Sequence, residues 1–192
     1  MKVEIINYHD HWQAVKDAAM NTIGKGDGKY PSDAWKRKIL LAEHSPIRLL
    51  EFTIRFTDIP YWQVMQIVRH HEGCSHFVST QRTDRTGVDR TKLTQDALIS
   101  YTLVCNAQAL INISRKRLCS QAAPETRQAW MQVIKAVREV EPIVASVCVK
   151  ECVYRGHCPE MRSCGYTQNG AFELEKQAYR AGVAIAVEPE KA

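Results

Sequence analysis

Residues 49–71, LLEFTIRFTDIPYWQVMQIVRHH, change their hydrophobic period at Pro60, and this change points to the fold class. Before Pro60, apolar and polar side chains alternate as in a strand with one buried face. The apolar positions are Leu50, Phe52, Ile54 and Phe56. After Pro60, which suits the first turn of a helix, Val64 and Ile67 recur at helical spacing. The stretch therefore predicts a strand followed by a helix over residues 61–71.

The rest of the chain shows the same mixture of strand and helix patterns. Residues 24–33 hold three glycines and a proline and predict a loop, with Ser32 or Asp33 capping the helix that follows. Over residues 96–121, apolar side chains recur at helical spacing and predict one long core helix. The other expected elements are a strand over 2–8, helices over 11–23, 34–44 and 124–142, and a polar loop or flexible flap over 83–94. Together they predict an α+β protein with a single domain over residues 1–192.

Composition and charge exclude several classes of protein. Of the 192 residues, 45% are apolar and 24% are charged, which excludes a disordered or fibrous chain. The N-terminal segment lacks the apolar core of a signal peptide, and no run approaches the roughly 20 apolar residues of a membrane span. We therefore expect a cytoplasmic protein without membrane contact. The net charge of +5 favours an anionic ligand, such as a nucleotide, a cofactor phosphate or nucleic acid.

Four of the seven cysteines crowd into one C-terminal segment, as Cys148, Cys152, Cys158 and Cys164. Structural zinc sites typically contain closely spaced cysteine pairs, and only Cys148 and Cys152 approach such a spacing. The other interpretation is a set of buried or redox-silent thiols in a compact segment. We favour the free thiols and predict no metal site, while a zinc-stabilised interaction protein stays open as an alternative.

Basic and polar side chains concentrate between Gln66 and Arg82. Arg69 lies three residues after Gln66, on about the same helix face, so an amide and a guanidinium can approach one ligand together. A guanidinium binds phosphate or carboxylate through two parallel hydrogen bonds, and the imidazoles of His70 and His71 can stack on a flat aromatic group. The alternative is a basic helix C-terminus, which the helix dipole favours for structural reasons alone.

A second group of polar side chains interrupts the apolar pattern of residues 96–121. The group consists of Asn106, Gln108, Asn112, Arg115 and Arg117. Asparagine is mildly unfavourable inside a helix, so we expect a compensating ligand or partner. Alternatively, neighbouring backbone satisfies the amides and the SRKR run is solvated. Nucleic-acid binding through that run lacks the aromatic side chains that usually accompany it.

Three short motifs occur in the order found in one enzyme family. EHSP (residues 43–46) precedes the alternating strand, RHH (residues 69–71) stands seven residues ahead of Ser79, and NAQALINISRKR (residues 106–117) follows on a later helix. This order resembles the flavin-dependent thymidylate synthases, whose signature is Arg-His-Arg, seven residues and then Ser. The resemblance runs from about Glu43 to Arg127. It implies that family's fold, a central, mostly antiparallel sheet flanked by long helices.

The resemblance also implies a reaction and its partners. Family members carry out the reductive methylation of dUMP to dTMP, with the one-carbon unit from methylenetetrahydrofolate and the reducing equivalents from NADPH through FAD. They are homotetramers that bind flavin and nucleotide between subunits, which would explain polar helix groups without partners in their own chain. The protein itself supplies orientation and electrostatics, as in other cofactor enzymes. The expected partners are therefore small nucleotide and folate substrates, and neither a membrane nor nucleic acid.

Site residues follow from the resemblance position by position. The implied dUMP ligands are Gln66, Arg69, Ser79, Arg82, Arg90 and Arg117. The implied FAD ligands are His44, Ser45, Arg69, His70, His71, Asn106 and Asn112. Arg117 is the expected catalytic residue, because a guanidinium against the uracil ring stabilises the negative charge that develops there. Without the resemblance, His44 would be read as structural, as a lone histidine at the junction of two elements usually is.

The chain departs from the family signature at several positions. His71 replaces the third signature residue, Phe77 stands where an acid is often found, and Gln81 stands where an arginine usually follows the serine. Further departures are Cys74, His76 and Gln108. Possible sources of the missing phosphate charge are Arg82, Arg85 and Arg90. A divergent branch of the family is the simplest interpretation. Hydroxymethylation of a pyrimidine nucleotide, another nucleotide substrate, and a basic nucleic-acid-binding module without enzyme activity stay open as alternatives.

Overall fold

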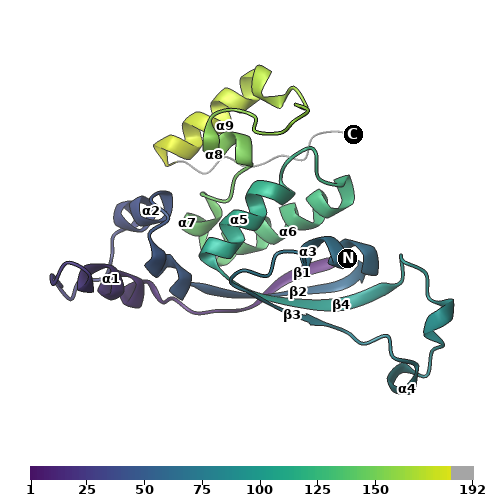
Figure 1. Ribbon diagram of the computed structural model, residues 1–192. Coiled ribbons are helices and arrows are strands. Elements are labelled where there is room, and N and C mark those ends of the chain that lie inside the picture. The colour runs from purple at the N-terminus through teal and green to yellow at the C-terminus, as the bar shows by residue number, and fades with distance from the viewer. Residues whose placement is uncertain (183–192) are drawn as a thin grey trace.

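The computed structural model describes residues 1–182 and contains a four-stranded antiparallel sheet with α5 and α6 over one face (Figure 1). The strands are β1 (Lys2–Tyr8), β2 (Glu51–Pro60), β3 (Cys74–Val78) and β4 (Leu98–Asn106). Their order across the sheet is β1-β2-β4-β3, and every neighbouring pair is antiparallel. The predicted α+β class with a central, mostly antiparallel sheet is confirmed.

Helices fill the connections between the strands and most of the chain after β4. They are α1 (Trp12–Asn21), α2 (Asp33–Leu41), η1 (Ser45–Leu49), α3 (Tyr61–Ile67), α4 (Thr83–Thr86), η2 (Arg90–Lys92), α5 (Ala107–Arg117), α6 (Pro124–Val140), α7 (Pro142–Ala145), α8 (Glu151–Arg155), η3 (Tyr166–Gln168) and α9 (Gly170–Ala181). The predicted helices over 11–23, 34–44 and 124–142 are confirmed as α1, α2 and α6, with shorter ends. Ser32 caps α2, because its hydroxyl accepts a hydrogen bond from the backbone N–H of Trp35 (3.3 Å).

The buried face of β2 is the one that the alternation predicts. The side chains of Phe52, Ile54 and Phe56 are fully buried, and they belong to the same core as Trp130 of α6. The indole N–H of Trp130 donates to the hydroxyl of Ser114 on α5 (2.9 Å). The two helices that cover the sheet are therefore joined by a buried hydrogen bond as well as by apolar packing.

The prediction of one helix over residues 96–121 is wrong. Residues 98–106 form β4, and α5 begins only at Ala107. The buried apolar side chains of β4 are Ile99, Tyr101, Leu103 and Cys105. Their spacing of two residues is that of a strand, and the helical spacing farther along the chain conceals it. Asn106 marks the boundary, because it ends the strand and caps α5 with its side chain.

The helix predicted over residues 61–71 is shorter than expected, since α3 ends at Ile67 and an unpredicted strand, β3, follows. Gly73 turns the chain into β3 with a φ of +69°, and a Cβ at this position would lie 2.6 Å from Asn106 Nδ2. Strand β3 is short, lies at the edge of the sheet and exposes Ser75 and Phe77. It therefore lacks the apolar alternation that reveals a strand in a sequence.

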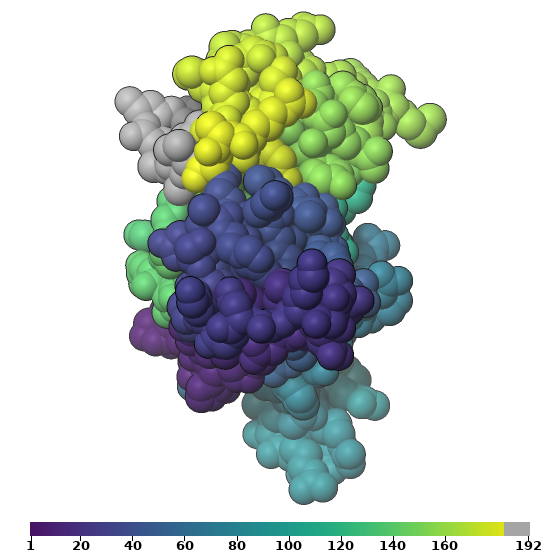
Figure 2. Space-filling view, turned by 90° about the vertical axis from the view of Figure 1, so that its left-hand side faces the viewer, coloured from purple at the N-terminus to yellow at the C-terminus, as the bar shows by residue number. Residues whose placement is uncertain are grey.

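Residues 79–97, here called the arm, project beyond the body of the protein from the ends of β3 and β4 (Figures 1 and 2). The arm carries α4 and η2, and nearly all of its side chains are exposed. The predicted polar loop over residues 83–94 is confirmed in its exposure, although it contains these short helical turns.

The extent of the apolar core and the absence of a membrane-spanning helix both refer to residues 1–182. Within them, the buried apolar side chains other than Ala129 form one cluster. No helix among these residues combines the length and the apolar character needed to cross a lipid bilayer. A single domain over residues 1–192 stays a prediction, because residues 183–192 lie outside the described part of the chain.

Candidate functional site

An open hollow of about 160 Å³ lies between the residues that follow α3 and one face of α5. Its lining residues are Arg69, His70, His71, Glu72, Ala109, Asn112 and Ile113. Arg69, His71 and Asn112 are exposed, so they present a guanidinium, an imidazole and an amide to a ligand. The structure thus brings together four of the predicted ligands, although they come from segments that are about 40 residues apart.

His70, which lines the hollow, forms a hydrogen-bonded pair with Arg117, which lies beside it. Arg117 Nε donates to His70 Nε2 (2.9 Å), and Arg117 Nη2 donates to the backbone carbonyl of Gln66 (2.5 Å). Burial, together with the charge of Arg117, lowers the pKa of His70 from 6.5 to about 4. The imidazole is therefore neutral at pH 7 and accepts a hydrogen bond at Nε2, while Arg117 is held in one orientation.

A second chain of hydrogen bonds supports His70 from the sheet. His76 on β3 lies between the hydroxyl of Tyr101 (2.7 Å from Nδ1) and the backbone carbonyl of His70 (2.8 Å from Nε2). Since a carbonyl only accepts, Nε2 of His76 carries the proton and Nδ1 accepts from the tyrosine hydroxyl. Burial raises the pKa of Tyr101, which keeps this hydroxyl protonated. The sequence gives no sign of Tyr101, because the register of β3 on β4 creates the contact.

The polar side of α5 is fixed by Glu43, which lies in the turn between α2 and η1. Glu43 accepts a hydrogen bond from Gln108 Nε2 (2.7 Å) and forms an ion pair with Arg115. Although burial opposes it, hydrogen bonds from Arg115 and Gln108 lower the pKa of Glu43. The same two residues also donate to Asn112 Oδ1 (3.4 and 3.3 Å). These contacts orient the amide of Asn112, so its NH₂ group is left to donate toward the hollow.

The other predicted FAD ligands lie near α5 but outside the lining of the hollow. His44 immediately precedes η1, Ser45 begins it, and both side chains are exposed. Asn106 Oδ1 accepts a hydrogen bond from the backbone N–H of Ala109 (2.9 Å), which gives this side chain a structural role as a helix cap. The assignment of these three residues to FAD stays a prediction.

The predicted phosphate ligands lie on the arm. Ser79 begins it, and its hydroxyl accepts a hydrogen bond from the backbone N–H of Ser100 (3.1 Å). Arg82 donates two hydrogen bonds to Asp84 (3.0 and 2.7 Å), and Arg90 is exposed in η2. These residues are not part of the hollow of their own chain within residues 1–182. Their assignment to dUMP therefore stays a prediction.

Solved structures with this fold were found, although their sequences differ widely from this one. The flavin-dependent thymidylate synthase ThyX from Helicobacter pylori, complexed with FAD and dUMP, has a TM-score of 0.63 at 10% identity, over 78% of this chain and 100% of that one. A second structure of that enzyme with FAD and dUMP has a TM-score of 0.61 at 12% identity, over 78% and 99%. The UMP/dUMP methylase PolB from Streptomyces cacaoi, bound with 5-Br dUMP, has a TM-score of 0.62 at 15% identity, over 76% and 93%.

At the level of sequence, the comparisons found no match: no protein-family model and no curated protein matches this chain. At 10–15% identity, the likeness to the solved structures establishes the fold and nothing finer. The chain has the fold of the flavin-dependent thymidylate synthase ThyX.

Proposed function

We propose that this protein is a flavin-dependent thymidylate synthase, or a close relative, that converts dUMP to dTMP by reductive methylation. Methylenetetrahydrofolate would supply the one-carbon unit, and NADPH would supply the reducing equivalents through FAD. One observation carries the proposal: the pair formed by Arg117 and His70 adjoins Arg69 at the hollow, on a fold shared with structures that hold FAD and dUMP. Fold alone does not define an activity, so the chemistry of these side chains is essential to the proposal.

The residues of the hollow fit a flavin by their chemistry. Arg69, His71 and Asn112 offer hydrogen-bond donors to carbonyl or phosphate oxygens. Ala109 and Ile113 also line the hollow, but both are almost completely buried in the core of the protein, so the exposed polar side chains supply most of the contact that a ligand would make. FAD, when bound, would supply the hydride chemistry that side chains lack. The task of these residues is then to bind the ring and to fix its orientation.

The size of the hollow favours a site shared between subunits. Pockets for ligands of drug or cofactor size commonly measure about 300–1,000 Å³, whereas this hollow measures about 160 Å³. One chain would therefore form one wall, and a second chain would complete the site. The exposed arm, with Arg82 and Arg90, could carry phosphate-binding charge to a neighbouring subunit. These features support an oligomer with sites between subunits, and the oligomer that the sequence resemblance implies is a homotetramer.

Arg117 is the proposed catalytic residue. Its Nε and Nη2 atoms are held by His70 and by the carbonyl of Gln66, so Nη1 is left to face a pyrimidine. A guanidinium in that position would stabilise negative charge on the uracil ring as the ring attacks the one-carbon donor. Neutral His70 makes this arrangement compatible with pH 7, because a protonated imidazole would repel the guanidinium.

The test compares two variants in the full-length protein. Arg117→Ala should abolish dTMP formation while FAD stays bound, because Arg117 lies beside the hollow and does not line it. Lys135→Ala removes an exposed cation on α6 and should leave turnover unchanged. The readouts are product formation and the visible absorbance of oxidised flavin. Unchanged turnover in Arg117→Ala would contradict the role of that residue, and a colourless protein that takes up no FAD would contradict the proposed function.

A further inference from the structure

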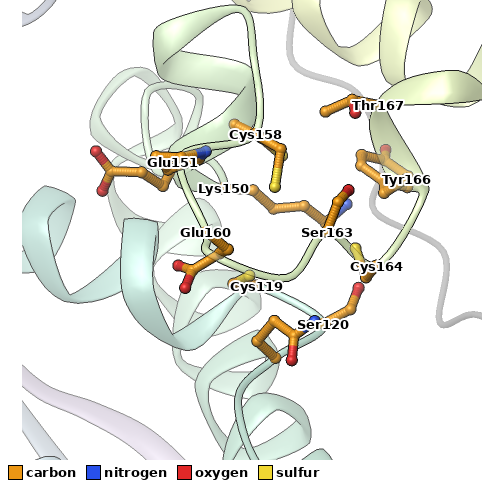
Figure 3. A pocket seen from close by; sticks show the side chains of 13 residues that line it. Cys119, Ser120, Lys150, Glu151, Cys158, Glu160, Ser163, Cys164, Tyr166 and Thr167 are labelled. Carbon is orange, nitrogen blue, oxygen red and sulfur yellow. The ribbon is translucent and has the colours of Figure 1, made fainter.

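Four cysteines from three separate segments line one small cavity of about 10 Å³ (Figure 3). They are Cys119, Cys152, Cys158 and Cys164. Cys119 follows α5, Cys152 lies on α8, and the other two lie on the loop between α8 and η3. This grouping differs from the one in the sequence, because Cys148 is buried elsewhere and its thiol donates to the backbone carbonyl of Val144 (3.4 Å).

The loop over residues 156–165 has few contacts of its own to hold it in place. None of its side chains belongs to the apolar core of residues 1–182. Within that part of the chain, no backbone N–H of residues 157–164 donates to a backbone carbonyl. Ordering a residue costs roughly 1–2 kcal/mol of backbone entropy. A loop of this length therefore needs some other constraint to adopt one conformation.

The path of the loop brings its cysteines to the turn that follows α5. Gly156 and Gly165 have φ values of +82° and +81°, so the chain turns sharply just before Cys158 and just after Cys164. Between these turns, the carbonyl of Arg162 accepts a hydrogen bond from Gln121 Nε2 (3.1 Å), which lies in the same turn as Cys119. The loop is thus docked on the segment that carries the remaining thiol.

We propose that Cys119, Cys152, Cys158 and Cys164 bind one zinc ion as thiolates. Four protein ligands make a closed structural site, and zinc takes thiolates in tetrahedral geometry at about 2.3 Å. The cavity has about the volume that one water molecule needs, which suits a single ion. The ion would crosslink the loop to α8 and to the turn after α5, and so supply the constraint that the loop lacks.

Binding requires the four thiols to turn inward. As they stand, the side chains of residues 1–182 include no group of three or more metal-ligand residues arranged to hold an ion. A cysteine thiol moves by rotation about one side-chain bond, and metal binding displaces its proton. The zinc centre would carry two negative charges. Lys150, which lines the same cavity, already forms an ion pair with Glu175 (2.9 Å), so its ammonium group would offset this charge only in part.

The metal content of the full-length protein tests this proposal independently of flavin binding. Protein purified without chelators, or reconstituted with zinc under reducing conditions, should contain about one zinc ion per chain when its metal content is measured by elemental mass spectrometry. Cys158→Ser and Cys164→Ser should each lose the zinc, whereas Cys74→Ser, on β3, should retain it. Cys158→His should also retain it, because imidazole is a zinc ligand and a purely structural thiol would not be replaced in this way.

Three results would overturn the proposal. The first is a protein that stays free of zinc after reconstitution, and the second is iron in place of zinc. The third is a count of free thiols in the denatured chain that is two lower than the number of cysteines, which would indicate a disulfide. If the serine variants fail to fold, the wild-type protein still decides the question. A strong chelator should then lower its melting temperature, and added zinc should restore it; no change with chelator would contradict a structural zinc ion.

Discussion

The pKa of His70 offers a direct check on the geometry of the candidate site. It falls from 6.5 to about 4, with burial as the larger cause and the charge of Arg117 as the next. Arg117→Met removes the charge and keeps a side chain of similar length. Because burial remains, we expect the pKa of His70 to rise by about one pH unit rather than to its ordinary value. One pH unit corresponds to about 1.4 kcal/mol of coupling between the two side chains.

Titration of the imidazole signals by NMR measures this coupling. Arg69→Met is the matched control, because Arg69 is exposed and is the last of the causes that lower the pKa of His70. It should change that pKa by a few tenths of a pH unit at most, since solvent screens exposed charges. A wild-type pKa near the ordinary value, or the same pKa in Arg117→Met as in wild type, would refute the reasoning.

The lowered pKa of His70 also predicts how the free energy of unfolding depends on pH, because the folded and the unfolded chain bind different numbers of protons. Between about pH 4 and 6.5, the unfolded chain binds a proton on His70 that the folded chain does not. The contribution of neutral His70 to the free energy of unfolding is therefore fully present above pH 6.5, and it is lost as the pH falls toward 4. Allowing for solvent at this half-buried group, we expect a loss of about 1–2 kcal/mol. Urea unfolding of wild type and His70→Gln, compared across this pH range, measures it.

The remaining predictions concern stability and are checked by urea unfolding. Glu141→Ala removes the carboxylate that accepts a hydrogen bond from the buried indole N–H of Trp12 (2.9 Å). We expect the free energy of unfolding to fall by about 2–4 kcal/mol, because hydrogen bonds to charged groups are strong. A fall of less than about 1 kcal/mol would contradict this. Gly73→Ala places a Cβ against Asn106 at positive φ and should cost about 1–3 kcal/mol. Gly26→Ala, in open space and without positive φ, is its control and should change stability by less than about 0.5 kcal/mol.

Strand β2 could be predicted because one of its faces is buried and the other is not. Phe52, Ile54 and Phe56 therefore alternate with polar residues, and the periodicity is readable. Strand β4 could not be predicted in the same way, because its apolar residues run without a break into those of α5. The boundary depends on the cap at Asn106, which only the folded chain reveals. Strand β3 could not be predicted for another reason: it is a short strand at the edge of the sheet, and few of its side chains are buried.

The candidate site shows the same division between local and long-range information. The motifs identified Arg69, His70, Asn112 and Arg117, and the fold brings them together around or beside the hollow. The support for these residues came from pairings far apart in sequence, such as the hydrogen bond between His76 and Tyr101. Likewise, the sequence groups Cys148 with Cys152, Cys158 and Cys164, whereas in the structure Cys119 lies with these three. This difference arises because the loop over residues 156–165 docks on the turn after α5. No local spacing encodes such contacts.

The chemical identity of the product tests the proposed function most directly. The purified protein, reconstituted with FAD, is incubated with dUMP, methylenetetrahydrofolate and NADPH, and the nucleotide is analysed by mass spectrometry. We expect dUMP to gain one methyl group, and we expect this gain to disappear in Arg117→Ala but to persist in Lys135→Ala. A hydroxymethylated nucleotide would contradict the methylation and would place the protein with the alternative chemistry. Unchanged dUMP in the presence of bound flavin would contradict the proposed reaction itself.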